Sequence, residues 1–204
     1  MTTFRATQVE AYRRYRDSEW TTYEELIATL RGELVANEAM KFGTAVHTAC
    51  EAYHTRPEPL YHVDEYKFSP ASIKHATNGL DHYASCETKV SRRLYAEDGT
   101  ELTLTGTCDV ITGTHVIDYK TTMKSISDAK IQAYQDSYQW RCYLAMTGCD
   151  TFTFRIMQWA EDAGFWYIKN MQDVRCDRYI GMIDDVERMV RELYEFTKQC
   201  KELV

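Results

Sequence analysis

The stretch "GTCDVITGTHVIDYKTT", residues 106–122, carries two aspartates and a lysine on two expected strands. Residues 112–113 are Thr-Gly, a turn signal between runs rich in β-branched side chains, which predicts a hairpin. Successive side chains of a strand alternate between its faces, so Asp118 and Lys120 share one face, with Asp109 on the neighbouring strand. Two interpretations fit this set: a surface ion pair on an exposed hairpin, or a metal-dependent centre that cleaves phosphodiester bonds.

The composition limits the class of protein. The chain has 204 residues, a mass of 23.9 kDa and a net charge of −7, which argues against binding nucleic acid through general basicity. An enzyme with a local basic path and an acidic, metal-filled pocket is not excluded. The sequence contains no run of about 18 apolar residues, and its start lacks an apolar signal core, so we expect a cytoplasmic protein without a membrane span.

The cysteines predict ordinary thiols. There are seven, an odd number, and they are scattered along the chain without a CxxC pair. A zinc ribbon or finger needs closely spaced pairs, so this pattern excludes that kind of site. In a cytosolic protein, such cysteines are expected to be free and mostly in the core.

The periodicity of the sequence changes several times along the chain. Apolar residues recur at helical spacing in five segments and then again at the C-terminal end, namely 6–18, 23–34, 38–54, 69–87, 127–147 and 172–200. Between these segments, residues 89–122 read as a three-stranded antiparallel meander with an Asp98-Gly99 turn, and residues 150–160 and 164–170 read as two further strands. The irregular window 55–70 holds all three prolines and is expected to be a connection.

This order of elements predicts an α/β fold with a central mixed β-sheet flanked by helices. We expect residues 1–204 to form a single domain with no internal repeat. Within it, residues 1–40 are expected to be a helical N-terminal elaboration, residues 41–170 the catalytic core and residues 171–204 a C-terminal helix.

The chemistry of phosphodiester hydrolysis explains why these residue types are of interest. The reaction needs a nucleophilic water and stabilisation of charge on the phosphoryl oxygens, and hard divalent cations with oxygen ligands supply both. Asp109 and Asp118, on adjacent strands, could grip one Mg²⁺ or Mn²⁺ ion, and the backbone carbonyl of Tyr119 is a further candidate ligand. Lys120, on the same face as Asp118, could orient the water or stabilise the developing charge.

Four short motifs, in order, resemble those of the PD-(D/E)xK nuclease superfamily and, within it, the RecB-like exonuclease group. That group shows G-x-x-x-H on a helix, then G-x-x-D, then D-x-K-T, then Q-x-x-x-Y on a later helix. The sequence contains Gly43 to His47, Gly106 to Asp109, Asp118 to Thr121, and Gln139 to Tyr143. The D-x-K pair alone is a weak signal, whereas the ordered set on the expected element types is specific. The resemblance implies a restriction-endonuclease-like core.

The resemblance also implies roles for the matching residues. His47, Asp109 and Asp118 correspond to metal ligands, and Lys120 to the catalytic lysine. Gln139 and Tyr143 correspond to a pair that helps to hold the site and the DNA strand. We also expect Lys124 to contact DNA. Glu51 lies one helical turn after His47 and is expected near the metal, either directly or through water. Taken singly, each of these residues is more often an ordinary structural or solvated side chain.

Departures from the group bear on cofactors. Many relatives carry an iron–sulfur cluster whose first cysteine follows the opening helix, and the opening segment here has no cysteine. We therefore expect Mg²⁺ or Mn²⁺ and no iron–sulfur cluster. The chain also lacks a P-loop, so no helicase motor is expected within it.

Three functions remain open from the sequence. The first is a metal-dependent DNA exonuclease that prefers single-stranded or frayed ends, in phage or repair and recombination DNA processing. The second is an end-processing subunit of a larger complex, with a recombination or CRISPR-type partner, as in spacer acquisition. The third is a nuclease fold that has lost catalysis and serves as a DNA-binding module, against which the intact Asp109, Asp118 and Lys120 argue. The sequence does not indicate the oligomeric state.

Overall fold

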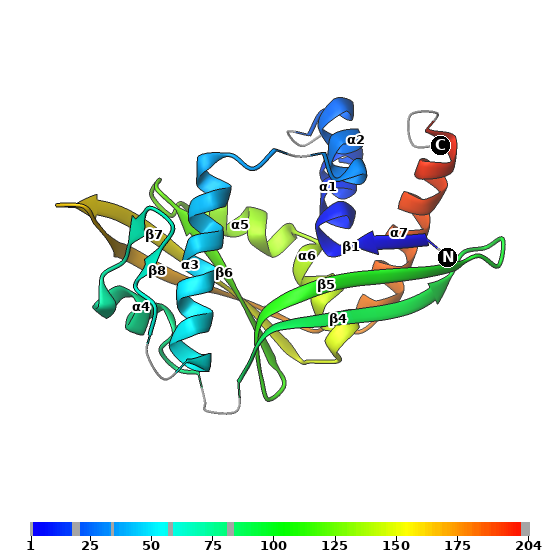
Figure 1. Ribbon diagram of the computed structural model, residues 1–204. Helices are drawn as coiled ribbons and strands as arrows, with labels where there is room; N and C mark the ends of the chain where they lie inside the picture. Colours follow the sequence, from blue (N-terminus) through cyan, green and yellow to red (C-terminus); the bar gives the residue numbers. More distant parts are fainter. Residues whose placement is uncertain (1, 18–20, 34, 57–58, 81–83, 201–204) are drawn as a thin grey trace.

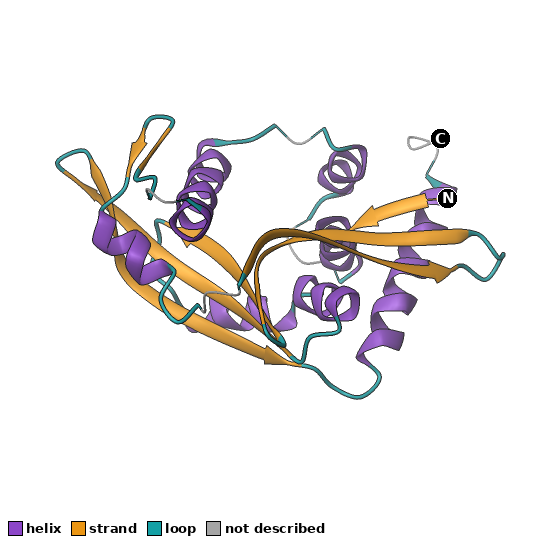
Figure 2. Ribbon diagram, turned by 60° about the horizontal axis from the view of Figure 1, so that its bottom comes forward, coloured by secondary structure: helices purple, strands orange, loops and turns teal. Residues whose placement is uncertain are grey.

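A computed structural model describes residues 2–17, 21–33, 35–56, 59–80 and 84–200 of the chain. Within these segments, a mixed β-sheet forms the centre and helices pack on both of its faces (Figures 1 and 2). The β4–β5 hairpin runs toward one end of the molecule and the β7–β8 hairpin toward the other (Figure 1). No helix among the described residues is both long and apolar enough to cross a membrane. The expected α/β fold with helices flanking a central mixed sheet is confirmed.

The elements follow the chain in this order: β1 (Thr2–Arg5), α1 (Ala6–Arg16), α2 (Tyr23–Arg31), α3 (Glu38–Thr55), β2 (His62–Val63), β3 (Tyr66–Lys67), α4 (Pro70–Ala76), β4 (Ser85–Tyr95), β5 (Glu101–Thr112), β6 (His115–Thr122), α5 (Asp128–Asp136), α6 (Gln139–Thr147), β7 (Thr151–Asp162), β8 (Phe165–Asp177) and α7 (Met182–Gln199). The main sheet has the order β1-β5-β6-β7-β8, with β4 on the other edge of β5. The pairs β1–β5 and β6–β7 are parallel, and β4, β5 and β6 form the expected antiparallel meander.

Strands β5 and β6 pair over a short length only and then diverge. Their register joins Val110–Thr112 to residues 115–117, and β1 covers the same edge of β5 only as far as Thr105. Residues 106–109 of β5 therefore have neither β1 nor β6 paired with them. Asp109 directly precedes the paired segment on β5, and Asp118 directly follows it on β6, so the two carboxylates stand at the fork between the strands.

Each face of the sheet has its own apolar core. On one face, α3 and α4 pack over β6 and β7 around Phe42, Phe68 and Trp159, whose rings meet edge to face. On the other face, α1, α6 and α7 cover β5 and β7 through buried side chains such as Leu144 and Leu193. These two cores fix α3 and α6 on opposite sides of the fork, which places their polar side chains next to it.

Three of the expected helices differ from the structure. The expected helix over residues 69–87 is wrong in its last part, because α4 ends at Ala76 and residues 85–87 belong to β4, which pairs with β5. The expected helix over residues 172–200 is wrong in its first part, because β8 continues to Asp177 and α7 begins at Met182. Residues 172–177 pair with residues 151–156 of β7, and this pairing decides their conformation over their helical spacing. The expected helix over residues 127–147 is two helices, α5 and α6, with a break at Ser137 and Tyr138.

A buried carboxylate from α1 accounts for the break between α5 and α6. Glu10 is only 7% exposed, and its Oε2 accepts a hydrogen bond of 2.6 Å from the backbone N–H of Tyr138. Its Oε1 accepts from Arg13 at 3.0 Å and from Arg14 at 2.8 Å, which compensates the buried charge. An acceptor at the start of α6 favours a new helix origin there. This contact joins residues 128 positions apart, so local periodicity does not reveal it.

A close approach of α6 to β5 explains the first glycine of the G-x-x-D motif. A Cβ added at Gly106 would lie 2.6 Å from Cε1 of Tyr143 and 3.1 Å from Cε of Met146. Tyr143 is 6% exposed and its ring stacks on Phe152 with centroids 5.8 Å apart, so it has little room to move. The absence of a side chain at Gly106 thus lets the tyrosine close the gap beside the fork.

Gly106→Ala should therefore destabilise the protein by about 1–3 kcal/mol, the usual range for an overpacked core. The matched control is Gly43→Ala in α3, where the added Cβ would stand 3.4 Å from Thr121 Oγ1, an ordinary contact. That variant should unfold at the wild-type temperature or slightly above it, since alanine favours a helix interior. Thermal and urea unfolding of both variants checks this, and equal stability of the two would contradict the close-packing explanation.

Candidate metal and active site

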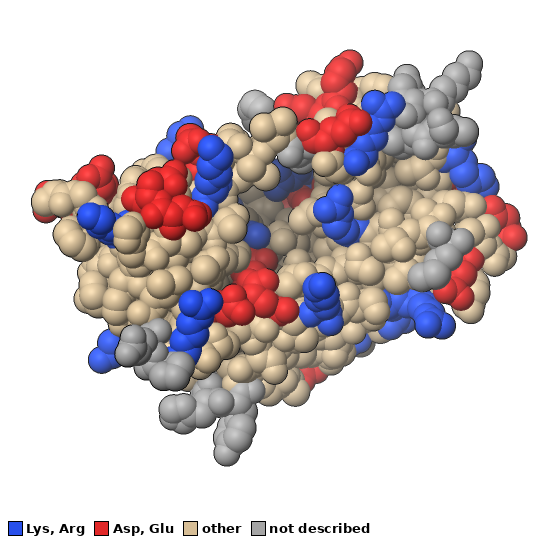
Figure 3. Space-filling model, in the orientation of Figure 1, with Lys and Arg blue, Asp and Glu red and all other residues tan. Residues whose placement is uncertain are grey.

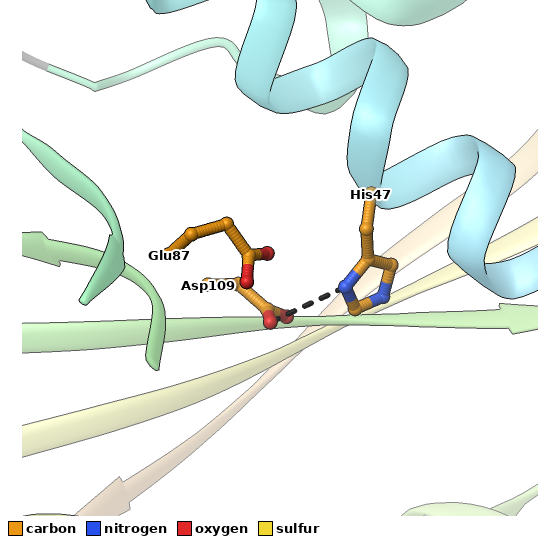
Figure 4. A group of neighbouring side chains, drawn as sticks. All are labelled: His47, Glu87 and Asp109. Carbon is orange, nitrogen blue, oxygen red and sulfur yellow. Dashed lines mark ion pairs between the residues drawn. The ribbon is translucent and has the colours of Figure 1, made fainter. Parts of the chain in front are cut away.

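The imidazole of His47 reaches the fork from α3. Figure 4 shows the ring pointing from the helix toward Asp109 on β5, with Glu87 of β4 beside it. Nε2 of His47 lies 2.9 Å from the backbone carbonyl oxygen of Tyr119, and Nδ1 lies 3.2 Å from Oδ1 of Asp109. When Nε2–H donates to the carbonyl, Nδ1 keeps its lone pair on the side of Asp109. The carbonyl contact thus orients Nδ1 as a ligand atom.

Asp109 ties the two diverging strands together. Its Oδ2 accepts a hydrogen bond of 2.6 Å from the backbone N–H of Tyr119, while its Oδ1 faces His47. Because the side chain is only 9% exposed, these two contacts hold the carboxylate in one orientation. Both backbone groups of Tyr119 therefore point into the fork, the N–H to Asp109 and the carbonyl to His47. The tyrosine ring itself packs in the core on the α3 face.

Asp118 and Lys120 form an ion pair on the other side of β6. Nζ of Lys120 is 2.7 Å from Oδ2 of Asp118, and the lysine also lies over the ring of Phe154 at 5.7 Å from its centroid. Gln139 at the start of α6 donates to Oδ1 of Asp118 at 3.4 Å. The expected alternation that puts Asp118 and Lys120 on one face is thus observed, and α6 supplies the third member of the group.

Glu87 is a candidate ligand that the sequence interpretation missed. The carboxylate of Glu87, Asp109 and the imidazole of His47 offer ligand atoms that all lie within 4.8 Å of one another. Glu87 stands opposite Asp109, between the paired residues 86–110 and 88–108. Its backbone has φ of 46°, a left-handed conformation that costs a non-glycine residue free energy and that is often retained at functional sites.

The sequence does not reveal Glu87, because the register of its hairpin is shifted by one residue. The observed pairing is centred on Asp98, with Tyr95 opposite Glu101, so residues 87 and 109 are equally far from the turn. The expected two-residue turn at Asp98-Gly99 is centred one half-step later and would place residue 88 opposite residue 109. The expected strand also begins at residue 89, two positions too late to include this carboxylate.

Burial of several charges in a small volume perturbs their titration. Desolvation raises the pKa of Asp118 to about 6, although Lys120 opposes this effect. Burial alone would lower the pKa of Lys120, but the neighbouring Asp118 carboxylate has the larger opposite effect, so the pKa of Lys120 is raised. The same balance raises the pKa of His47, where Asp109 outweighs burial. Burial, with Asp109 next, raises the pKa of Glu87. Lys120 and His47 thus compensate only part of the negative charge of Asp118 and Glu87.

These donors fit a hard divalent cation. The closest group is His47, Glu87 and Asp109, which offers two carboxylates and one nitrogen. Asp118 is outside this group but near enough to interact electrostatically with Asp109 and His47, and the Tyr119 carbonyl lies beside His47. Oxygen-rich donors of this kind suit Mg²⁺ or Mn²⁺. A bound cation of this kind would neutralise the carboxylates, activate a water molecule and polarise a phosphoryl oxygen. The raised pKa values of Asp118 and Glu87 support this fit, since a cation removes the repulsion that causes part of each shift.

Of the remaining residues expected at the site, Glu51 and Lys124 lie outside the closest ligand group, whereas Tyr143 lies beside the fork as part of its wall. Glu51 is half-buried on α3 and contributes to the raised pKa of Glu87 without joining the closest ligand group. Lys124 is exposed just after β6, where its N–H donates to Thr122. Tyr143 is nearly buried against Gly106 and Phe152, so we assign it chiefly to holding α6 on β5.

The seven cysteines are all free thiols, six of them buried and Cys86 half-buried. Burial raises the pKa of several of these thiols, including those of Cys50 and Cys142. Thiols of this kind are poor nucleophiles and poor metal ligands in this state, which suits a packing role.

Comparisons with known proteins agree with this geometry. A sequence model of the PD-(D/E)XK nuclease superfamily matches residues 11–203. No curated protein matches the chain. Among solved structures, SSO0001 is 14% identical, with a TM-score of 0.56 over 98% of this chain and 78% of that one. The alkaline exonuclease LHK-Exo from Laribacter hongkongensis is 17% identical, with a TM-score of 0.54 over 97% and 89%. At these identities the likeness establishes a shared fold.

Affinity for a divalent cation should depend on pH through Asp118. Its folded-state pKa is raised to about 6, so below pH 6 the carboxyl carries a proton that a cation must displace. Mn²⁺ should therefore bind more strongly at pH 7.5 than at pH 5 and raise the unfolding temperature more at the higher pH, and affinity should fall by up to about tenfold per pH unit below 6. Calorimetric titration at several pH values measures this. Equal affinity at pH 5 and pH 7.5 would contradict the role of Asp118.

Proposed function

Because the chain belongs to the PD-(D/E)XK nuclease superfamily, we propose that it is a Mg²⁺- or Mn²⁺-dependent deoxyribonuclease that removes nucleotides from DNA ends. The observation that carries the proposal is the convergence of Asp109, Asp118 and Lys120 at the fork of β5 and β6. In this proposal residues 1–204 act as one catalytic domain. Its place is in phage or in repair and recombination DNA processing.

Each side chain of the fork has a role in this proposal. Asp109, Asp118 and the Tyr119 carbonyl hold the cation, with His47 and Glu87 completing the set from α3 and β4. Lys120, kept protonated by Asp118, orients the attacking water and offsets charge that develops on the phosphate. Gln139 keeps Asp118 in place from α6. An arrangement preorganised in this way lowers the barrier because it needs no reorientation during the reaction.

The surroundings of the fork favour a single flexible strand. A hollow of about 620 Å³ lies between α1, α2, α3 and α6, with Arg14 and Gln139 among its lining residues. Figure 3 shows the face of the molecule hollowed near its centre, with basic and acidic side chains around the opening. A strand end enters such a space more readily than a stiff duplex. The fold shared with an alkaline exonuclease also supports attack at ends.

Removal of either charge of the buried pair should stop cleavage. Asp118→Asn and Lys120→Gln should each lower the cleavage rate at least about 10²-fold, the usual loss when a preorganised electrostatic group is removed. Excess chelator should do the same to the wild type. The matched control, Asp162→Asn at the exposed end of β7, should cut at the wild-type rate. Nucleotide release from end-labelled DNA measures these rates, and wild-type activity in Asp118→Asn would refute the assignment.

The end requirement predicts a difference between linear and circular substrates. Linear single-stranded DNA should lose nucleotides progressively, while a closed circle of the same sequence should resist the enzyme because it offers no end. Blunt duplex should be degraded more slowly than duplex with a single-stranded overhang. Gel assays of the three substrates under Mn²⁺ test this. Cutting of the closed circle as fast as the linear strand would mean endonuclease action.

A further inference from the structure

A second hollow lies on the β4–β5 hairpin, next to the fork. Its volume is about 410 Å³, and its polar lining consists of two cationic and four hydroxyl side chains, namely Arg5, Lys89, Thr7, Ser91, Thr105 and Thr107. Gly106 and Tyr143 form part of its wall, so it begins where the unpaired edge of β5 faces α6. No carboxylate lines it among the described residues. In a chain with a net charge of −7, such a lining is unusual.

The register of the hairpin relates this hollow to the metal ligands. On the face of β4 and β5 that carries Glu87 opposite Asp109, the next pair is Lys89 opposite Thr107, and Ser91 opposite Thr105 follows. Successive pairs on one face are about 6.7 Å apart, since a strand rises about 3.3 Å per residue. A spacing of this size matches the step between neighbouring phosphates of an extended strand. The face thus changes from acidic to basic within one such step.

The charges of the hollow are available for a ligand. Within the described segments, neither Lys89 nor Arg5 forms an ion pair with a carboxylate, whereas most other arginines of the chain do. Lys89 and Ser91 are exposed on the outer strand β4. Arg5 and Thr7 also line the hollow that contains Gln139, the partner of Asp118. The two hollows therefore share Arg5 and Thr7 at the start of α1, on either side of which they lie near the fork.

We propose that Lys89 and Arg5, with the hydroxyls of Thr105 and Thr107, form a subsite for a phosphate group of the bound DNA strand, one step from the phosphate that is cut. The proposal rests on the proposed function and deepens it, because it names where an acidic protein gains local affinity for DNA. Lysine binds phosphate as a point charge, and hydroxyls donate hydrogen bonds to phosphate oxygens. A strand held at this subsite would have its neighbouring phosphate next to Asp109.

The alternative for Lys89 is a protective role. Exposed edge strands often carry lysine because a charge prevents pairing with another chain, and β4 pairs only with β5. That role does not involve Arg5, which lies on β1 across the sheet from β4. A measurement that compares both residues in DNA binding therefore separates the two interpretations.

The test measures binding without cleavage. A fluorescent single-stranded oligonucleotide is titrated with wild-type protein, Lys89→Gln and Arg5→Gln in the presence of chelator, at several salt concentrations. The matched control is Lys169→Gln, an exposed lysine on β8 that lines neither hollow. Unfolding temperatures confirm that each variant is folded. A second set of oligonucleotides carries one uncharged methylphosphonate linkage at defined distances from the end, with or without a terminal phosphate.

If the subsite exists, Lys89→Gln and Arg5→Gln should each weaken binding about three- to tenfold. Each should also reduce the steepness of the plot of log affinity against log salt concentration (the salt slope) by about 0.7, the value for one phosphate contact on a single strand. Lys169→Gln should bind as the wild type does. One methylphosphonate position, or loss of the terminal phosphate, should weaken wild-type binding and have little further effect on Lys89→Gln. Wild-type affinity and salt slope in both variants would overturn the subsite while leaving the nuclease proposal intact. Failure of the wild type to bind or cut any DNA would overturn both.

Discussion

The hydrogen bond from the backbone N–H of Tyr119 to Asp109 joins two strands at the point where they separate. Strand pairing would normally satisfy this N–H, but β5 has already diverged from β6 there. The carboxylate of Asp109 accepts this hydrogen bond in place of a backbone carbonyl of β5. The same residue turns its carbonyl toward His47, so one peptide segment orients both a candidate acid ligand and a candidate nitrogen ligand. The position of every other group at the site follows from this fork.

Two helices hold the fork open from opposite faces. Helix α3 crosses β6 where Gly43 lies close to Thr121, and this approach brings His47 down to Tyr119. Helix α6 starts anew at Gln139 because Glu10 of α1 binds the N–H of Tyr138, and this origin directs Gln139 toward Asp118. The buried carboxylate of Glu10 therefore affects the site without touching it. Its cost is offset by Arg13 and Arg14.

The sequence reveals the local part of this arrangement. Alternation along β6 predicts Asp118 and Lys120 on one face, and the order of motifs predicts that His47 and Asp109 join them. What it does not reveal depends on contacts between distant segments. The break before α6 depends on Glu10, and the strand conformation of residues 172–177 depends on pairing with β7. Glu87 belongs with these, because its place opposite Asp109 depends on the observed register of the hairpin, which a two-residue turn at Asp98-Gly99 does not predict.

The β4–β5 face has an acidic region and a basic region, and together they explain how a chain with net negative charge could bind both a cation and DNA. Carboxylates gather at the fork, where burial and mutual repulsion raise the pKa of Asp118 and Glu87 and favour a cation. Positive charge and hydroxyls follow one pair further along the same strands.

Anomalous diffraction from crystals soaked in Mn²⁺ tests the central claim most directly. We expect one anomalous peak, or two adjoining peaks, in contact with Asp109. Asp118, Glu87 or the carbonyl of Tyr119 should be the other protein ligands. Peaks found only at other carboxylates would contradict a metal site at the fork.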